Sequence, residues 1–235
     1  MSGIDADVLK WIKRIAFGCR KCRIVLAFLV IFCAPACTAP DPAASEAIPA
    51  PQGQVLFSDD FSDPQSGWET WSENGSMVIY QDGGLRILVN QPQYDYWSRP
   101  GKRYADTRLE VDAVKLAGPD NNDYGLICRH KDRDNYYAFL IGSDGYAGVL
   151  KVYQGVYTLL NHQTLEFQPA VNQGPAMNHL RAECIGSTLS MYINEQKVFE
   201  VQDQDMIEGE VGVIAGAYDQ PGVDVIFDNF AILQP

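Results

Sequence analysis

Side chains that could do chemistry are concentrated in the stretch "CRHKDRDNYYAFLIGSDGY", from Cys128 to Tyr146. A His and several carboxylates so close together could bind a metal or act as acid and base. However, "KDRD" and "SDG" separate apolar runs, where hairpins need polar turn residues. His130 has no second His or Cys at ligand spacing, which argues against zinc and favours a lone surface His. Arg129 lies on the face opposite Leu126 and Cys128, so it is expected to point out of the sheet, away from the core.

Aromatic residues suggest binding rather than catalysis. Aromatic rings cover the apolar faces of sugars while polar neighbours take the hydroxyl groups. Tyr94 and Tyr96 alternate in "QYDYW" and Tyr136 stands on the second strand of the hairpin, so these three are candidate contacts. For Tyr94 and Tyr96, core packing is an equal alternative. Core packing is preferred for Trp97, Tyr137 and Phe139.

The N-terminal segment has the pattern of an export signal. Basic residues precede the apolar run "IVLAFLVIF" at positions 24–32, and the small-residue segment "CAPAC" follows. A membrane span needs roughly 20 apolar residues, so this run is too short for one. Small residues before Cys37 resemble a bacterial lipobox, so residues 1–37 predict a signal peptide with lipidation at Cys37; ordinary secretion is the alternative. Residues 38–54, rich in Ala and Pro, predict a tether.

Cysteine positions predict one disulfide in the exported domain. Three of the six cysteines lie in the leader and Cys37 would carry the lipid, which leaves Cys128 and Cys184. An oxidising compartment favours a bond between them. Two separately buried thiols are the alternative.

Composition and charge limit the partners. A chain of 235 residues with 46% hydrophobic residues can bury one sizeable core. The formal net charge is −12, and removal of the basic leader makes it more negative. Such a surface repels phosphate backbones, so we expect no nucleic-acid partner. Neutral polymers and cations remain as ligands.

Residues 55–235 show the pattern of an all-β domain. Short apolar runs are separated by turn signals such as Asn74-Gly75, and no apolar stripe of period 3.6 is long enough for a helix. In "TRLEVDAVKL", Leu109, Val111 and Ala113 alternate with charged residues. Half-buried antiparallel strands in this number predict a β-sandwich or a β-barrel.

Several segments carry a family resemblance. The opening "FSDDFSDPQSGW", the strand after "DGGLRI", the central "YGLICRHKDRDNYYAFLIGSDGY" and the closing "VDVIFDNFAIL" resemble the concanavalin A-like lectin/glucanase jelly roll. The chain is similar in particular to laminin-G-like domains of bacterial envelope proteins. The resemblance implies a two-sheet jelly roll over residues 55–233 with a concave sheet that often holds a glycan, and it does not imply catalysis.

The resemblance also supplies an enzymatic alternative. Glycoside hydrolases of this fold carry a Glu, an Asp and a second Glu on one face of a strand. In "LEVDAVK", Glu110 and Asp112 match the first two positions, but Val114 and Lys115 stand where the acid/base Glu should be. Retaining chemistry needs two carboxyl groups, so the match is incomplete. Alternating solvent-facing charges on a strand are the preferred explanation of Glu110 and Asp112.

A calcium ion is also implied by the resemblance. In related jelly rolls, a calcium on the convex side ties the first strand to the last. The matching positions are Asp228, Asp60 and the carbonyl of Gly84, and oxygen ligands of this kind suit Ca²⁺. Capping of strand ends by Asp60 and Asp228 is the alternative.

Together these observations predict a monomeric, envelope-anchored β-sandwich that binds a glycan or another extracellular polymer on its concave sheet. One rival is a glycoside hydrolase with atypical catalytic residues, and another is a structural or protein-interaction module. The predicted contacts are Tyr94, Tyr96, Glu110, Asp112, Arg129 and Tyr136.

Overall fold

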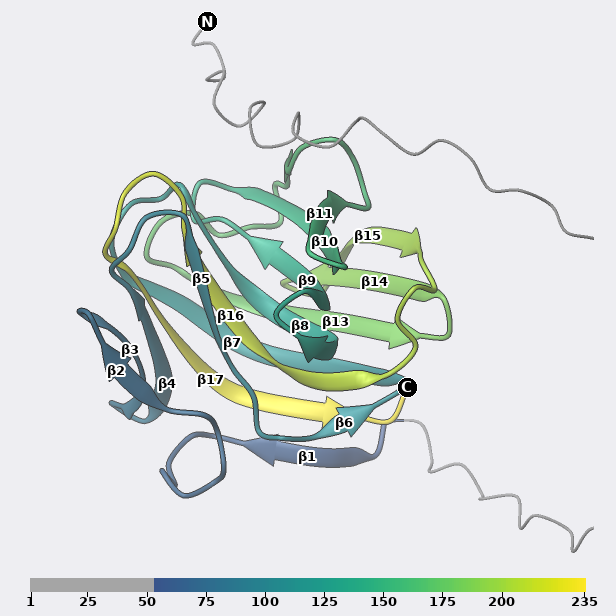
Figure 1. The fold of residues 1–235 in the computed structure, drawn as a ribbon, viewed down its shortest axis with the longest axis horizontal. Coiled ribbons are helices and arrows are strands. Elements are labelled where there is room, and N and C mark those ends of the chain that lie inside the picture. The colour runs from purple at the N-terminus through teal and green to yellow at the C-terminus, as the bar shows by residue number, and fades with distance from the viewer. Residues whose placement is uncertain (1–52) are drawn as a thin grey trace, which may run out of the picture. The chain divides into compact units, whose positions relative to one another are not determined.

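A computed structural model of the protein describes residues 53–235, which form two antiparallel β-sheets (Figure 1). The predicted signal peptide, Cys37 and most of the predicted tether lie outside the described residues. Within residues 53–235, no helix could cross a membrane.

One sheet has nine strands in the order β15-β14-β13-β7-β17-β4-β3-β2, with β1 paired to β17. The first and last strands of the domain are therefore neighbours, as Figure 1 shows. The strands of this sheet are β1 (Val55–Asp59), β2 (Trp71–Glu73), β3 (Ser76–Gln81), β4 (Gly84–Val89), β7 (Thr107–Ala117), β13 (Met177–Ile185), β14 (Thr188–Ile193), β15 (Gln196–Gln202) and β17 (Val223–Leu233).

The other sheet has eight strands in the order β11-β10-β9-β8-β16-β5, with β12 paired to β10 and β6 paired to β16. The strands of this sheet are β5 (Tyr94–Ser98), β6 (Arg103–Tyr104), β8 (Asn122–Asp132), β9 (Asn135–Ile141), β10 (Tyr146–Tyr153), β11 (Val156–Leu159), β12 (Glu166–Phe167) and β16 (Gly209–Ala217).

Alternation and turn chemistry explain these strands. On β7, Leu109, Val111 and Ala113 are fully buried while the residues between them are partly exposed, as period-2 alternation requires. The hairpin between β2 and β3 turns at Asn74-Gly75, whose φ angles are 52° and 78°. Positive φ at both positions is typical of a type I′ turn. "KDRD" also turns as predicted, between β8 and β9.

The core lies between the two sheets, and a disulfide crosses it. Cys128 on β8 and Cys184 on β13 are both fully buried and bonded to each other, which confirms the predicted pairing and joins one sheet to the other. Tyr137 and Phe139 are buried in the same core, as predicted. The predicted all-β, two-sheet antiparallel sandwich is confirmed.

Candidate functional site

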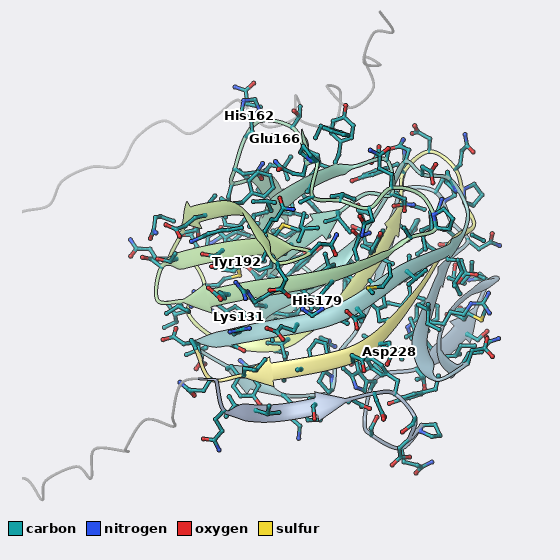
Figure 2. The ribbon with its side chains drawn as sticks, turned by 180° about the vertical axis from the view of Figure 1, so that it is seen from behind. Lys131, His162, Glu166, His179, Tyr192 and Asp228 are labelled. Atoms are coloured by element: carbon teal, nitrogen blue, oxygen red, sulfur yellow. A yellow bond between two sulfur atoms is a disulfide. The ribbon has the colours of Figure 1, made fainter. Side chains whose placement is uncertain are left out.

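The two sheets differ in the chemistry of their outer faces, the sides turned away from the core. The nine-stranded sheet has a charged outer face whose side chains pair with one another. The Arg181 guanidinium lies 3.6 Å from the centre of the Tyr192 ring, and His179 Nδ1 lies 2.8 Å from Asp112 Oδ1. Figure 2 shows His179, Tyr192 and Asp228 on the strands of this sheet. Such a face is an ordinary solvated sheet surface.

The outer face of the eight-stranded sheet is apolar instead. A second cluster of buried side chains, separate from the main core, lies there, with Trp97 and Leu150 packed on it and partly exposed. The described strands form only two sheets, so no further sheet covers this cluster. Its six buried members are 0–5% exposed, so neighbouring side chains cover them, and solvent reaches the cluster at Trp97 and Leu150. Partly exposed apolar side chains on an outer sheet face make it a candidate place for a ligand or partner. The buried members are Ile127, Tyr136, Ala138, Leu140, Val152 and Ile214.

Three rings meet at one end of this face. Trp97 of β5 lies 5.5 Å from His130 and 5.8 Å from Tyr136, and the His130 and Tyr136 rings lie 5.6 Å apart, all measured between ring centroids. The Tyr136 and Tyr157 hydroxyls hydrogen-bond to each other. Trp97, which is partly exposed, therefore packs on the rings of His130 and Tyr136.

His130 is buried in this aromatic group, so the prediction of a surface His is wrong. Burial, with help from the charge of Arg99, lowers the pKa of His130 to about 4. The imidazole is therefore neutral at pH 7. Its Nδ1 lies 2.9 Å from Arg99 Nη1 and must accept, because a guanidinium only donates. The proton is then on Nε2, which is buried and has no partner.

Two carboxylates lie on the same outer face, at the opposite end of the strands. Asp95 of β5 and Asp123 of β8 both pair with Gly216 of β16, which stands between them. Tyr218 hydrogen-bonds to Asp123, while Asp123 Oδ1 is buried without a partner. We refer to Asp95 and Asp123 as the carboxylate pair.

Burial changes the protonation of the carboxylate pair. Loss of solvent raises the pKa of Asp95 to about 6. Burial, and then the negative charge of Asp95, raise the pKa of Asp123 well above its ordinary value, against the effect of the Tyr218 hydrogen bond. Carboxyl groups with raised pKa on an apolar surface are typical of functional sites.

Arg129 does not face this surface, contrary to the prediction. The β8–β9 register shifts between Cys128 and Asp132, and Arg129 has a φ of 52°. A bulge interrupts alternation, so the side chain turns into the end of the sandwich and is buried. Its Nε donates to Ala105 O at 3.0 Å and its Nη1 to Met206 O at 2.9 Å.

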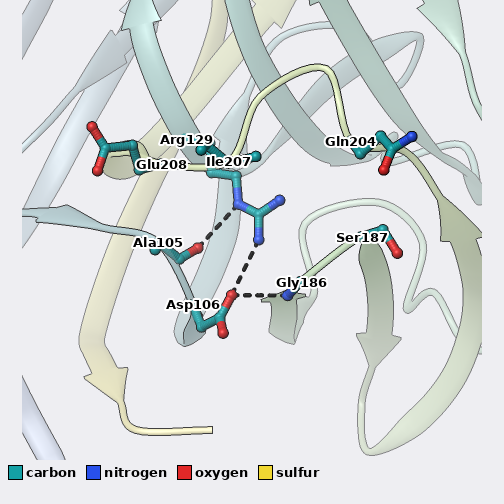
Figure 3. A pocket seen from close by; sticks show the side chains of 8 residues that line it. All are labelled: Ala105, Asp106, Arg129, Gly186, Ser187, Gln204, Ile207 and Glu208. Carbon is teal, nitrogen blue, oxygen red and sulfur yellow. Dashed lines mark hydrogen bonds and ion pairs between the residues drawn. The ribbon is translucent and has the colours of Figure 1, made fainter. Parts of the chain in front are cut away.

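Arg129 lines a pocket of about 430 Å³ at this end of the sandwich (Figure 3). Asp106 closes one side: its Oδ1 lies 3.4 Å from Arg129 Nη2 and accepts from Gly186 N at 2.8 Å. The exposed Ile207 lies on another side. Because protein groups already take three of the guanidinium's donors, Arg129 holds loops together here.

The other predicted contacts are divided between faces. Tyr94 and Tyr96 lie on the opposite side of β5 from Asp95 and Trp97. Tyr96 packs against the main core and Tyr94, 54% exposed, lies beside it with their ring centroids 6.1 Å apart. Tyr136 does face away from the core. Trp97, assigned to the core from its sequence, lies on the outer apolar cluster instead.

Glu110 and Asp112 belong to the other sheet. Both stand on the outer face of β7, in the nine-stranded sheet, where Glu110 is bonded to Arg108. Asp112 contacts His179 and accepts from Asn229 Nδ2 at 2.9 Å. The six predicted contacts therefore do not form one site. The prediction grouped them because the resemblance did not specify which strands share a sheet.

Two of the three predicted calcium ligands lie together. Gly84 and Asp228 line a pocket of about 310 Å³ with Asp82 and Asp112, on the outer face of the nine-stranded sheet. Asp60 does not line it, and its Oδ1 accepts hydrogen bonds from Ser62. Among residues 53–235, no group of three or more His, Cys, Asp or Glu side chains could hold a metal.

Sequence reasoning missed Asp95, Asp123, Tyr218 and the orientation of Trp97. The alternation in "QYDYW" separates Tyr94 and Tyr96 from Asp95 and Trp97, but it does not say which pair faces the core. The glycines of "GEVGVIAGA" were the available signal, because glycine in a strand often marks a close approach by a ligand or another chain segment.

Solved structures of low sequence identity share this fold. The carbohydrate-binding module CBM66 from Bacillus subtilis is 18% identical with a TM-score of 0.58, over 71% of this chain and 95% of that one. The GH43 protein BlXynB from Bacillus licheniformis is 14% identical with a TM-score of 0.58, over 80% of this chain and 41% of that one. A GlcNAcα1-4Gal-releasing endo-β-galactosidase from Clostridium perfringens is 11% identical with a TM-score of 0.55, over 82% of this chain and 64% of that one. No protein-family model and no curated protein matches the sequence.

Proposed function

We propose that the protein is a non-catalytic, lectin-like domain that binds a glycan or another extracellular polymer on the outer face of its eight-stranded sheet. The observation that carries the proposal is the partly exposed Trp97 ring on the outer apolar cluster, packed on His130 and Tyr136. Such a ring can cover the apolar face of a sugar. The fold, shared with a carbohydrate-binding module, supports it.

The polar groups on this face favour a neutral ligand. The carboxylate pair offers oxygens that accept hydrogen bonds from hydroxyl groups, and Asp123 Oδ1 has no protein partner. Negative charge at Asp95 would repel uronic acids and sulfated sugars. We therefore expect uncharged polysaccharides to bind more strongly than acidic ones.

A non-catalytic role is favoured because the nearest match to a hydrolase motif is already engaged. Glu110 is bonded to Arg108, and both oxygens of Asp112 contact neighbouring side chains. Neither carboxylate lies on the face with the aromatic rings. A glycoside hydrolase with atypical catalytic residues is the rival function, and the binding test must distinguish it from the lectin-like one.

Removal of the Trp97 ring should weaken glycan binding by about tenfold or more, since central aromatic contacts commonly carry most of the binding energy. Trp97→Leu keeps an apolar side chain and removes the ring. Binding of the purified protein to a polysaccharide panel measures the effect, and the melting temperature checks the fold. Tyr192→Ala, an aromatic change on the other sheet, is the matched control and should bind normally.

The same wells should be assayed for released reducing ends. Binding without release supports the lectin-like proposal, whereas release would favour the glycoside hydrolase. Equal glycan binding by Trp97→Leu and the wild type would exclude this face as the binding site. If no glycan binds, pull-down of an envelope protein that sugars do not compete away would favour the interaction module.

The proposal includes export to the cell envelope with a lipid on Cys37, as a monomer and without nucleic acid. The leader and its small-residue end support this part. Cells grown with labelled palmitate should incorporate label into the wild type and not into Cys37→Ser. Equal labelling of both would exclude lipidation at this residue and leave ordinary secretion.

A further inference from the structure

The carboxylate pair brings two negative charges together without a positive partner. Asp95 and Asp123 come from strands on either side of β16 and share the outer face. No Lys or Arg contributes to the pKa of either group. Two carboxylates in such surroundings repel each other unless a proton or a cation lies between them.

Gly216 makes the approach of the carboxylate pair possible. A Cβ on this residue would stand 2.1 Å from Asp95 Oδ1 and 2.2 Å from Asp123 Oδ1. The separation of the two oxygens therefore cannot exceed the sum of these distances. Two ligands of one calcium ion, each at 2.3–2.6 Å, can be up to about 5 Å apart. The spacing thus lies within the reach of a single ion.

One of the two oxygens that face this space, Asp123 Oδ1, has no hydrogen-bond partner. Asp123 is 5% exposed. A buried carboxylate oxygen without a partner is costly. The Tyr218 hydroxyl bonds to the same carboxyl group, which fixes its orientation. Asp95 is partly exposed, so an ion could enter from its side.

We propose that Asp95 and Asp123 bind a divalent cation of the calcium type on the outer face of the eight-stranded sheet. Carboxylate oxygens suit such a hard ion, with water or a ligand hydroxyl completing its coordination. Only two protein carboxylates take part, so we expect a dissociation constant of roughly 10⁻⁴–10⁻³ M, the range of extracellular modules. This site is separate from the one predicted at Asp228, and it stands whether or not the face binds a glycan.

A shared proton is the competing explanation, and it predicts different behaviour. A raised pKa means that the folded state binds the proton more tightly than the unfolded chain. Stability from Asp95 would then be fully present below about pH 4 and lost as pH rises through about 6. Other ionisable groups near the pair are Asp144, Tyr136, Tyr157 and Tyr218, of which only Asp144 titrates near this range.

The test is a calorimetric titration with CaCl₂ at pH 7.5, after removal of metal with EDTA. Asp228→Asn serves as the background, so that a cation at the other predicted site does not contribute. We expect one ion per chain, and Asp95→Asn or Asp123→Asn should weaken its binding by at least about tenfold, because affinity follows the number of charged ligands. Asp63→Asn, the same charge change on a distant exposed loop, should leave binding unchanged.

Thermal melting gives a second readout that needs only the partly exposed Asp95. In EDTA at pH 7.5, Asp95→Asn should melt higher than the background protein, since it removes one of two repelling charges. With 10 mM calcium the order should reverse, because only the intact pair gains from the ion. Absence of both calcium heat and reversal would overturn the cation site, and equal loss of binding in Asp63→Asn would do the same.

Discussion

Replacing Cys128 and Cys184 together by Ala should lower the free energy of unfolding by about 4 kcal/mol. The two residues lie 56 positions apart, and the bond closes this segment in the unfolded chain, which reduces its conformational entropy. Both sulfurs are fully buried between the sheets, so Ala avoids the unpaired hydroxyl that Ser would bury there. For a domain of this size, the melting temperature should fall by roughly 10 °C.

Urea denaturation of the wild type and the double variant, each with and without reductant, measures this effect. Reductant in the unfolding solution should lower the free energy of unfolding of the wild type to that of the double variant, whose own value should not change. A difference below about 1 kcal/mol would show that packing alone holds β8 to β13.

Replacing Arg129 by Met should cost about 3 kcal/mol of stability, because it leaves the carbonyl oxygens of Ala105 and the buried Met206 without their donor. Met keeps the apolar stem and removes only the guanidinium. The stability of Arg129→Lys should lie between those of the wild type and Arg129→Met, since an ammonium lacks the planar fork that reaches separate loops. Urea denaturation at constant pH provides the comparison.

Arg103 supplies the matched control for this substitution. Its guanidinium is about half exposed and lies 4.0 Å from Glu208, so Arg103→Met should change stability by less than about 0.5 kcal/mol. An Arg129→Met protein with the wild-type urea midpoint would mean that its hydrogen bonds contribute nothing net. Unchanged glycan binding by a folded Arg129→Lys would support its assignment to the loops and not to the ligand face.

Much of the fold could be predicted because it depends on local alternation. Leu109, Val111 and Ala113 face the core for the reason their spacing predicts, and a residue of β13 such as Ala182 behaves alike. The disulfide followed from the number of cysteines left after export. Predicting these features requires only the two-residue period of a strand and the oxidising compartment in which the exported domain would fold.

The candidate site could not be predicted in the same way because it depends on how strands neighbour each other. Asp95 and Asp123 are 28 positions apart in the sequence, and only the insertion of β16 between β5 and β8 brings them together. Trp97 and Tyr96 are adjacent, and which of them faces the core depends on the sheet that covers the other side. Arg129 reverses its direction at a bulge that no alternation pattern reveals.

The pairing of β1 with β17 determines how the domain would carry mechanical load. Gly53 N donates to Gln234 O at 2.8 Å, and β1 runs antiparallel to the final strand from there. Tension directed along β1 would load its cross-strand hydrogen bonds in shear, so that several must break together. Peeling from the other end would break them one at a time. With the proposed N-terminal anchor and the proposed ligand on the opposite sheet, a pull directed along β1 would therefore meet the more resistant arrangement.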